Sequence, residues 1–138
     1  MTQRGDDDGA LSGAPQGSSP LARAVWIDAR AAEVGYDWPD AMQARSKIDE
    51  ELGELHRAHD AGDAAEAEAE LGDVLLSLVS FARKGGMDVH RALAGALGRF
   101  ETRFAWAERT AAQRGRALAD MTAEELDALW HEAKAAVG

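Results

Sequence analysis

Two short acidic segments limit most strongly what this chain can fold into. The first is KIDEELGE at residues 47–54 and the second is ELGD at residues 70–73. Within the segments, Glu51 and Glu54 lie three residues apart, as do Glu70 and Asp73. On an α-helix this spacing places both side chains of a pair on one face. The pattern therefore predicts two helices that each present a pair of carboxylates.

The stretch between the two acidic pairs contains Gly62 and Asp63, which favour a turn. If this turn folds one helix back on the other, four carboxylates meet in a small volume. They repel one another unless a cation lies among them. Oxygen-only ligands suit hard divalent ions, Mg²⁺ first and Mn²⁺ next. Because Glu-rich helix faces are common, the spacing alone leaves a metal site and an ordinary acidic surface as alternatives.

Composition favours an all-α protein. The 138 residues are dominated by helix formers and include only three prolines. The absence of cysteine excludes disulfides, thiol catalysis and thiolate metal sites. The chain has an acidic N-terminus and lacks an apolar run of membrane-spanning length, so we expect a soluble cytoplasmic protein. A formal net charge of −10 argues against nucleic-acid binding.

Caps and apolar spacing predict about five helices with short connections. Residues 1–18 are rich in Gly, Ser, Asp and Gln and are expected to form a disordered leader. Residues 19–138 are expected to form one helical domain. Its helices are expected at about residues 20–34 and 39–61, after the caps Asp63 and Asp88, and after a capping box at Thr122.

Apolar stripes at helical spacing predict the core of this bundle. The third helix carries Leu71, Val74, Leu75, Leu78, Val79 and Ala82, and the fourth carries Leu93, Leu97, Phe100 and Phe104. The acidic pairs border the buried stripes, where a recessed metal site would need them. We expect a four-helix metal-binding core completed by a homodimer, because one protomer has more Trp and Leu positions than it covers.

The sequence gives less support to several other kinds of functional site. None of the four histidines follows a Glu by three residues, so the Glu-x-x-His motif of di-iron bundles is absent. His56 and His59 have the spacing of zinc ligands but lack a further ligand cluster, which favours surface histidines. Neither a P-loop nor a serine-hydrolase elbow is present. Trp38 suits either a ligand's ring or the core, and residue type alone favours the core.

The remaining interpretation is metal-assisted chemistry on an anionic substrate. Divalent ions held by the acids can bridge phosphate oxygens and activate a water. They also reverse the local field of a strongly acidic protein, so that a polyphosphate can bind. Lys47, Arg99 and Arg103 are candidates to hold the outer phosphates.

The two acidic segments resemble the Glu-Glu-x-x-Glu … Glu-x-x-Asp signature of MazG-type nucleoside triphosphate pyrophosphohydrolases. Further segments are similar to the same family, namely VGYDWPD at residues 34–40, RFETRF at 99–104 and MTAEELDALWHEAK at 121–134. The last of these resembles the end of the C-terminal catalytic domain in two-domain members. The resemblance runs from about residue 21 to residue 136.

The resemblance implies Mg²⁺-dependent hydrolysis of nucleoside triphosphates to the monophosphate and pyrophosphate, by homodimers or larger assemblies. By position, it assigns the metal and catalytic roles to Glu51, Glu54, Glu70 and Asp73, with Glu50 as the leading acid. It also places Lys47, Arg99 and Arg103 where the family keeps basic residues near the phosphates, and Trp38, whose ring could stack on a ligand, is the remaining substrate-binding candidate. Ser80 and Leu97 depart from the family, since many members carry asparagine there, and this puts the nucleotide preference in doubt.

Three hypotheses follow from the sequence. The first is a pyrophosphohydrolase that cleans the nucleotide pool, with no nucleic-acid or membrane partner. The second is a non-catalytic helical module that binds a nucleotide or a metal. The third is a plain helical dimerisation domain with an acidic face.

Overall fold

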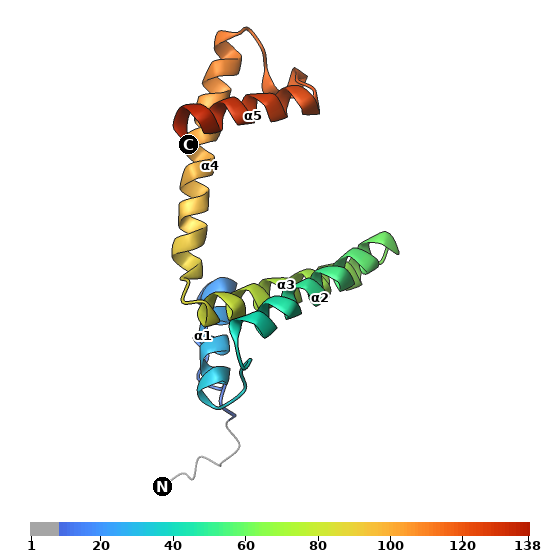
Figure 1. Ribbon diagram of the computed structural model, residues 1–138, viewed down its shortest axis with the longest axis vertical. Helices are drawn as coiled ribbons and strands as arrows, with labels where there is room; N and C mark the ends of the chain where they lie inside the picture. The colour runs from blue at the N-terminus through green and yellow to red at the C-terminus, as the bar shows by residue number, and fades with distance from the viewer. Residues whose placement is uncertain (1–8) are drawn as a thin grey trace. The chain divides into compact units, whose positions relative to one another are not determined.

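The computed structural model describes residues 9–138, which are helical with no strand (Figure 1). Five α-helices and one short 3-10 segment, η1, make up this part of the chain. This confirms the predicted all-α class and the expected number of helices. The chain divides into two compact units, with the boundary between Val89 and His90.

The first unit is built around a helical hairpin. Helix α2 (Ala41–Asp60) and helix α3 (Ala64–Lys84) lie side by side along their length (Figure 1). Gly62, with a φ of 72°, makes the turn between them, a conformation that favours glycine. The Asp63 carboxylate caps α3 by accepting a hydrogen bond from the Glu66 backbone N–H at 3.1 Å. The turn and cap predicted at these positions are confirmed.

Helix α1 (Pro20–Glu33) packs against α3. Ser19 caps it, as expected for a serine followed by proline. Of the expected disordered leader, residues 1–8 lie outside the described residues. Residues 9–18 contain turns, and the Ala10 carbonyl accepts a hydrogen bond from Arg30 Nε of α1 at 3.2 Å. This part of the leader is therefore in contact with the first unit.

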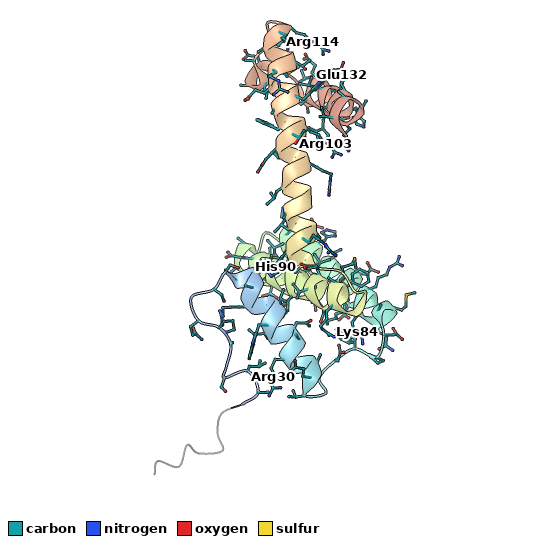
Figure 2. All side chains as sticks on the ribbon, turned by 90° about the vertical axis from the view of Figure 1, so that its left-hand side faces the viewer. Arg30, Lys84, His90, Arg103, Arg114 and Glu132 are labelled. Atoms are coloured by element: carbon teal, nitrogen blue, oxygen red, sulfur yellow. The ribbon has the colours of Figure 1, made fainter. Side chains whose placement is uncertain are left out.

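The second unit contains α4 (Val89–Gln113), η1 (Leu118–Asp120) and α5 (Ala123–Val137). The capping box predicted at Thr122 is confirmed. The contact between α4 and α5 has a core of three alanines and one leucine: Ala107, Ala111, Leu129 and Ala133. Arg114 of α4 donates two hydrogen bonds of 3.0 Å to the Glu132 carboxylate of α5 (Figure 2).

The structure corrects the predicted core. Val74, Val79 and Ala82 are buried, but the three leucines on the same stripe of α3 are 42–56% exposed: Leu71, Leu75 and Leu78. The predicted stripe of α4 is also 41–52% exposed, at Leu93, Leu97, Phe100 and Phe104. Helical spacing correctly groups these residues on one face of each helix, and that face stays largely exposed, although Trp130 of α5 contacts Phe100 with ring centroids 5.3 Å apart.

Two further observations concern helix boundaries and length. Helix α2 begins at Ala41, with Asp40 as its N-cap, and not at residue 39 as expected. The Asp40 carboxylate accepts a hydrogen bond from the Gln43 backbone N–H at 2.9 Å, which fixes the start of the helix. Among the described helices, none combines the length and apolar character needed to span a bilayer.

Candidate metal centre and adjoining cavity

The hairpin of α2 and α3 brings three of the four predicted acids together. One carboxylate oxygen each from Glu51, Glu70 and Asp73 lies within 4.8 Å of the other two. Glu70 and Asp73 share a face of α3 because they are three residues apart, and Glu51 faces them from α2. The arrangement predicted from spacing is therefore present for these three residues.

Glu51 is a buried charge with one partner. Its side chain is 9% exposed, and its Oε1 atom lies 2.8 Å from Lys47 Nζ. This ion pair is the main reason that the pKa of Glu51 is lowered and the pKa of Lys47 is raised. The second oxygen, Oε2, is buried and accepts no hydrogen bond from the described residues. Glu51 is thus ionised but incompletely satisfied.

Glu70 has the opposite electrostatic character. Burial of its carboxyl group, followed by the negative charge of Glu54, raises its pKa to about 7. Its Oε2 atom is also buried and has no hydrogen-bond partner within residues 9–138. Two of the carboxylates in the cluster therefore each have a buried oxygen without a donor among the described residues, and such orphaned acceptors are uncommon in proteins.

These observations fit a hard divalent cation. Every ligand atom is a carboxylate oxygen, and a bound ion would satisfy the orphaned oxygens of Glu51 and Glu70. It would also offset the repulsion that raises the pKa of Glu70. Glu54 lies close enough to affect that pKa but is outside the three-residue cluster, so its role as a ligand stays a prediction.

A cavity of about 560 Å³ adjoins the acidic cluster and is built by the first unit. Glu51, Asp73 and Lys47 line it together with the aromatic residues Tyr36 and Trp38. Its other lining residues are Leu11, Ile27, Asp28, Ala31, Gly35, Asp37, Leu76, Ser77 and Ser80. Trp38 is 36% exposed, so the structure contradicts the core position favoured by residue type and leaves its ring at the cavity.

An ionic network behind this cavity was not predicted from the sequence. Arg83 of α3 donates from Nε to Asp28 of α1 at 2.6 Å. Its Nη2 and Nη1 atoms donate to Asp37 at 2.5 and 3.2 Å, and Lys84 adds a contact of 3.3 Å to the same carboxylate. The hydrogen bond from Arg83 is the main reason that the pKa of Asp37 is lowered to about 2. The Ser80 hydroxyl donates to the second oxygen of Asp28.

The remaining predicted residues lie elsewhere. Arg99 and Arg103 are on α4, in the second unit, and their role toward phosphates stays a prediction. Arg103 is half-buried, and its Nε atom has no hydrogen-bond partner among the described residues. His56 and His59 are exposed on α2, as expected for surface histidines.

Comparison with known proteins finds a match to one protein family. Residues 41–106 match the MazG nucleotide pyrophosphohydrolase domain. The chain is 38% identical over 114 residues to a nucleoside triphosphate pyrophosphohydrolase/pyrophosphatase MazG of Thermotoga maritima, covering 83% of this chain and 44% of that protein. It is 35% identical over 127 residues to the nucleoside triphosphate pyrophosphohydrolase of Escherichia coli K12, covering 91% and 48% respectively. Residues 41–106 form a MazG-type domain.

The MazG match confirms the resemblance inferred from the acidic segments, and it includes both of them. It also includes Arg99 and Arg103, whereas α1 and α5 lie outside the matched range. The uncharacterized protein YabN of Bacillus subtilis is 44% identical over 66 residues, which is 48% of this chain and 14% of that protein. The chain spans less than half the length of the curated relatives named here.

Proposed function

We propose that this chain hydrolyses nucleoside triphosphates to nucleoside monophosphate and pyrophosphate, as part of nucleotide-pool clean-up in the cytoplasm. The observation that carries the proposal is the cluster of Glu51, Glu70 and Asp73, with two orphaned buried oxygens, beside a cavity of about 560 Å³. The MazG-type domain and the names of its curated relatives support the same reaction.

Mg²⁺ is the cofactor that we propose, with Mn²⁺ as a substitute. Glu51, Glu70 and Asp73 would hold it, and Glu54 is the candidate for a fourth ligand. When bound, the ion would polarise phosphate oxygens and increase the acidity of a water molecule. The chain itself contributes a fixed cation, because Lys47 lines the cavity and is held at 2.8 Å from Glu51. Arg99 and Arg103 remain candidates for the outer phosphates.

The position of cleavage tests this function directly. We expect that incubation with a nucleoside triphosphate and Mg²⁺ yields equal amounts of monophosphate and pyrophosphate, as resolved by ion-exchange chromatography. EDTA should stop the reaction, because four nearby acids without a cation would repel the polyphosphate. A product mixture of diphosphate and free phosphate would contradict the proposal. Binding without turnover would favour the non-catalytic module instead.

Homodimer formation is the second part of the proposal. The exposed stripe of Leu93, Leu97, Phe100 and Phe104 on α4 is a contiguous apolar face of the kind that marks protein interfaces. Phe100 and Phe104 stack with ring centroids 5.8 Å apart, which gives this face large aromatic surfaces. A second copy of the chain supplies the same stripe in an isologous arrangement.

Light scattering tests the dimer. We expect the parent protein to have twice the mass of one chain or more at micromolar concentration. Leu97→Glu places a charge in the middle of the stripe and should shift the mass to the monomer. Thr102→Glu is the control, because Thr102 is exposed and lies on the opposite side of α4 by helical periodicity. A monomeric parent protein, or equal masses for both variants, would contradict the proposed interface.

A further inference from the structure

Asp28 is a nearly buried carboxylate that lines the cavity beside the metal centre. Its side chain is 9% exposed, and it reaches the cavity from α1, whereas the acids of the metal centre come from α2 and α3. The proposed reaction at the metal centre leaves Asp28 without a role. A buried charge of this kind is costly unless it is well paired, so its partners define what it can bind.

Both partners of Asp28 direct their donors at its carboxylate, so that Asp28 and Ser80 together offer hydrogen-bond acceptors to the cavity. Ser80 donates its single hydroxyl proton to one oxygen, and Arg83 Nε donates to the other oxygen at 2.6 Å. The guanidinium of Arg83 faces the Asp28 carboxylate, and a carboxylate paired in this way offers only acceptors to a ligand. The hydroxyl oxygen of Ser80 retains free lone pairs because its proton is in use. A ligand that meets this wall must therefore bring donors.

The placement of this wall suits the base of a nucleotide. Asp73 and Ser80 both line the cavity from α3 and are seven residues apart. At the helical rise this separates them by about 10 Å along the axis, which is the scale of a nucleoside between its phosphate and the far edge of its base. Apolar and aromatic side chains, including Trp38 and Ile27, line the same cavity and can contact a ring.

We propose that Asp28, with Ser80, is a specificity-determining site that selects nucleobases carrying an exocyclic amino group. The inference rests on the proposed function, since it places the triphosphate at the metal centre. Cytosine and adenine carry such an amino group, a hydrogen-bond donor, at the edge of the base that lies far from the phosphates. Uracil and hypoxanthine match them in size but present a carbonyl oxygen, which the acceptors of Asp28 and Ser80 repel. Buried groups left unpaired in this way discriminate strongly between substrates.

Two substrate pairs of matched size test the proposal. We expect the parent protein to have kcat/KM values at least about tenfold higher for CTP than for UTP, and for ATP than for ITP, the cost of one mismatched buried hydrogen bond. Asp28→Asn keeps the shape but adds an amide donor, so both ratios should fall to about one or reverse. Glu132→Gln makes the same chemical change at an exposed arginine pair outside the cavity lining, and it should leave both ratios unchanged.

Binding measurements separate this inference from the proposed reaction and do not depend on how well Asp28→Asn folds. Calorimetry with the α,β-methylene analogues of CTP and UTP reports discrimination by the parent protein without turnover. Tighter binding of the cytidine analogue supports the inference even if hydrolysis is absent, in which case the proposed function alone fails. Equal affinity for the two analogues, or equal turnover of CTP and UTP, would overturn the inference about Asp28 without contradicting the proposed pyrophosphohydrolase reaction.

Discussion

Replacing Glu70 with Gln is expected to stop nucleotide hydrolysis and, at the same time, to raise the melting temperature of the metal-free protein. Glu70 contributes an orphaned buried oxygen to the acidic cluster, beside the charges of Glu51 and Glu54. Gln has the same shape but no charge, so it removes the repulsion and also the metal ligand. The loss of turnover should exceed the roughly 10–100-fold loss typical of residues that only support a metal ligand.

Adding Mg²⁺ should favour the parent protein over the variant. Mg²⁺ at a hundredfold excess over its dissociation constant should stabilise the parent protein by about 2.7 kcal/mol, if one ion binds only the folded state. Glu70→Gln should lose most of this gain. Thermal melts of the parent and of Glu70→Gln, each in EDTA and in Mg²⁺, give the four melting temperatures needed for this comparison. Functional acids commonly lower stability in this way when their partner is absent.

The pH dependence of the metal-free protein gives an independent check on Glu70. Its pKa is raised from 4.5 to about 7 in the folded protein, so the folded state binds more protons than the unfolded state between these values. The stabilising contribution is complete below about pH 4.5 and is lost as the pH rises through about 7. The melting temperature of the parent should fall across this range, and Glu70→Gln should show a smaller fall.

Glu68→Gln is the matched control, since Glu68 is an exposed acid on the same helix. We expect it to change neither turnover nor the response to Mg²⁺. If Glu70→Gln melts like the parent in both EDTA and Mg²⁺ and still hydrolyses nucleotides, the acidic cluster is a surface feature and the site assignment is wrong.

Local sequence signals predicted the hairpin and its acids because their causes are local. Gly62 permits a positive φ, Asp63 caps the next helix, and the three-residue spacing fixes which acids share a face. Once these features place α2 against α3, Glu51 meets Glu70 and Asp73 with little further freedom. The same local rules located the capping box at Thr122.

Contacts between distant segments could not be predicted in this way. The hydrogen bonds of Asp28 reach 52 and 55 residues along the chain, to Ser80 and Arg83. Nothing in the spacing around Asp28 distinguishes it from an ordinary surface acid of an amphipathic helix. The packing of α1 on α3 is what places it at the cavity, and that packing depends on the whole unit.

Periodicity also predicts which residues share a face without predicting what covers that face. Leu71, Leu75 and Leu78 have the spacing of a buried stripe, yet they are 42–56% exposed in a single chain. A stripe on α3 or α4 has the same sequence pattern whether its own chain or another chain covers it. The proposed dimer would account for the exposed faces, and the light-scattering test decides this.

Arg83→Met is expected to destabilise the first unit more than any other single change to its ion pairs. Arg83 joins three segments, because it bonds Asp28 of α1 and Asp37 of the connection to α2 from its own position on α3. Met replaces the aliphatic part of the side chain but leaves Asp28, which is 9% exposed, without its counter-ion. Removing one partner of a nearly buried pair should cost about 2 kcal/mol or more.

The matched control is Arg114→Met, which removes an equally well-formed pair at an exposed position. Arg114 and Glu132 are 52% and 47% exposed, so water can replace most of their interaction and the melting temperature should change little. Arg83→Met should lower the melting temperature by roughly 5–10 °C. Equal shifts for the two variants would show that Arg83 is an ordinary surface residue.

Acid titration tests how far the Asp37 carboxylate accounts for the stabilisation that Arg83 provides. The pKa of Asp37 is lowered from 3.8 to about 2, mainly by its hydrogen bond with Arg83, so its contribution is present above pH 3.8 and is lost as the pH falls to about 2. The difference in stability between the parent and Arg83→Met should therefore narrow across that range.

Because Asp37 and Trp38 are adjacent in the cavity wall, Arg83→Met should also raise KM for a nucleotide more than it lowers kcat. A lower kcat at constant KM would instead place Arg83 in the chemical step.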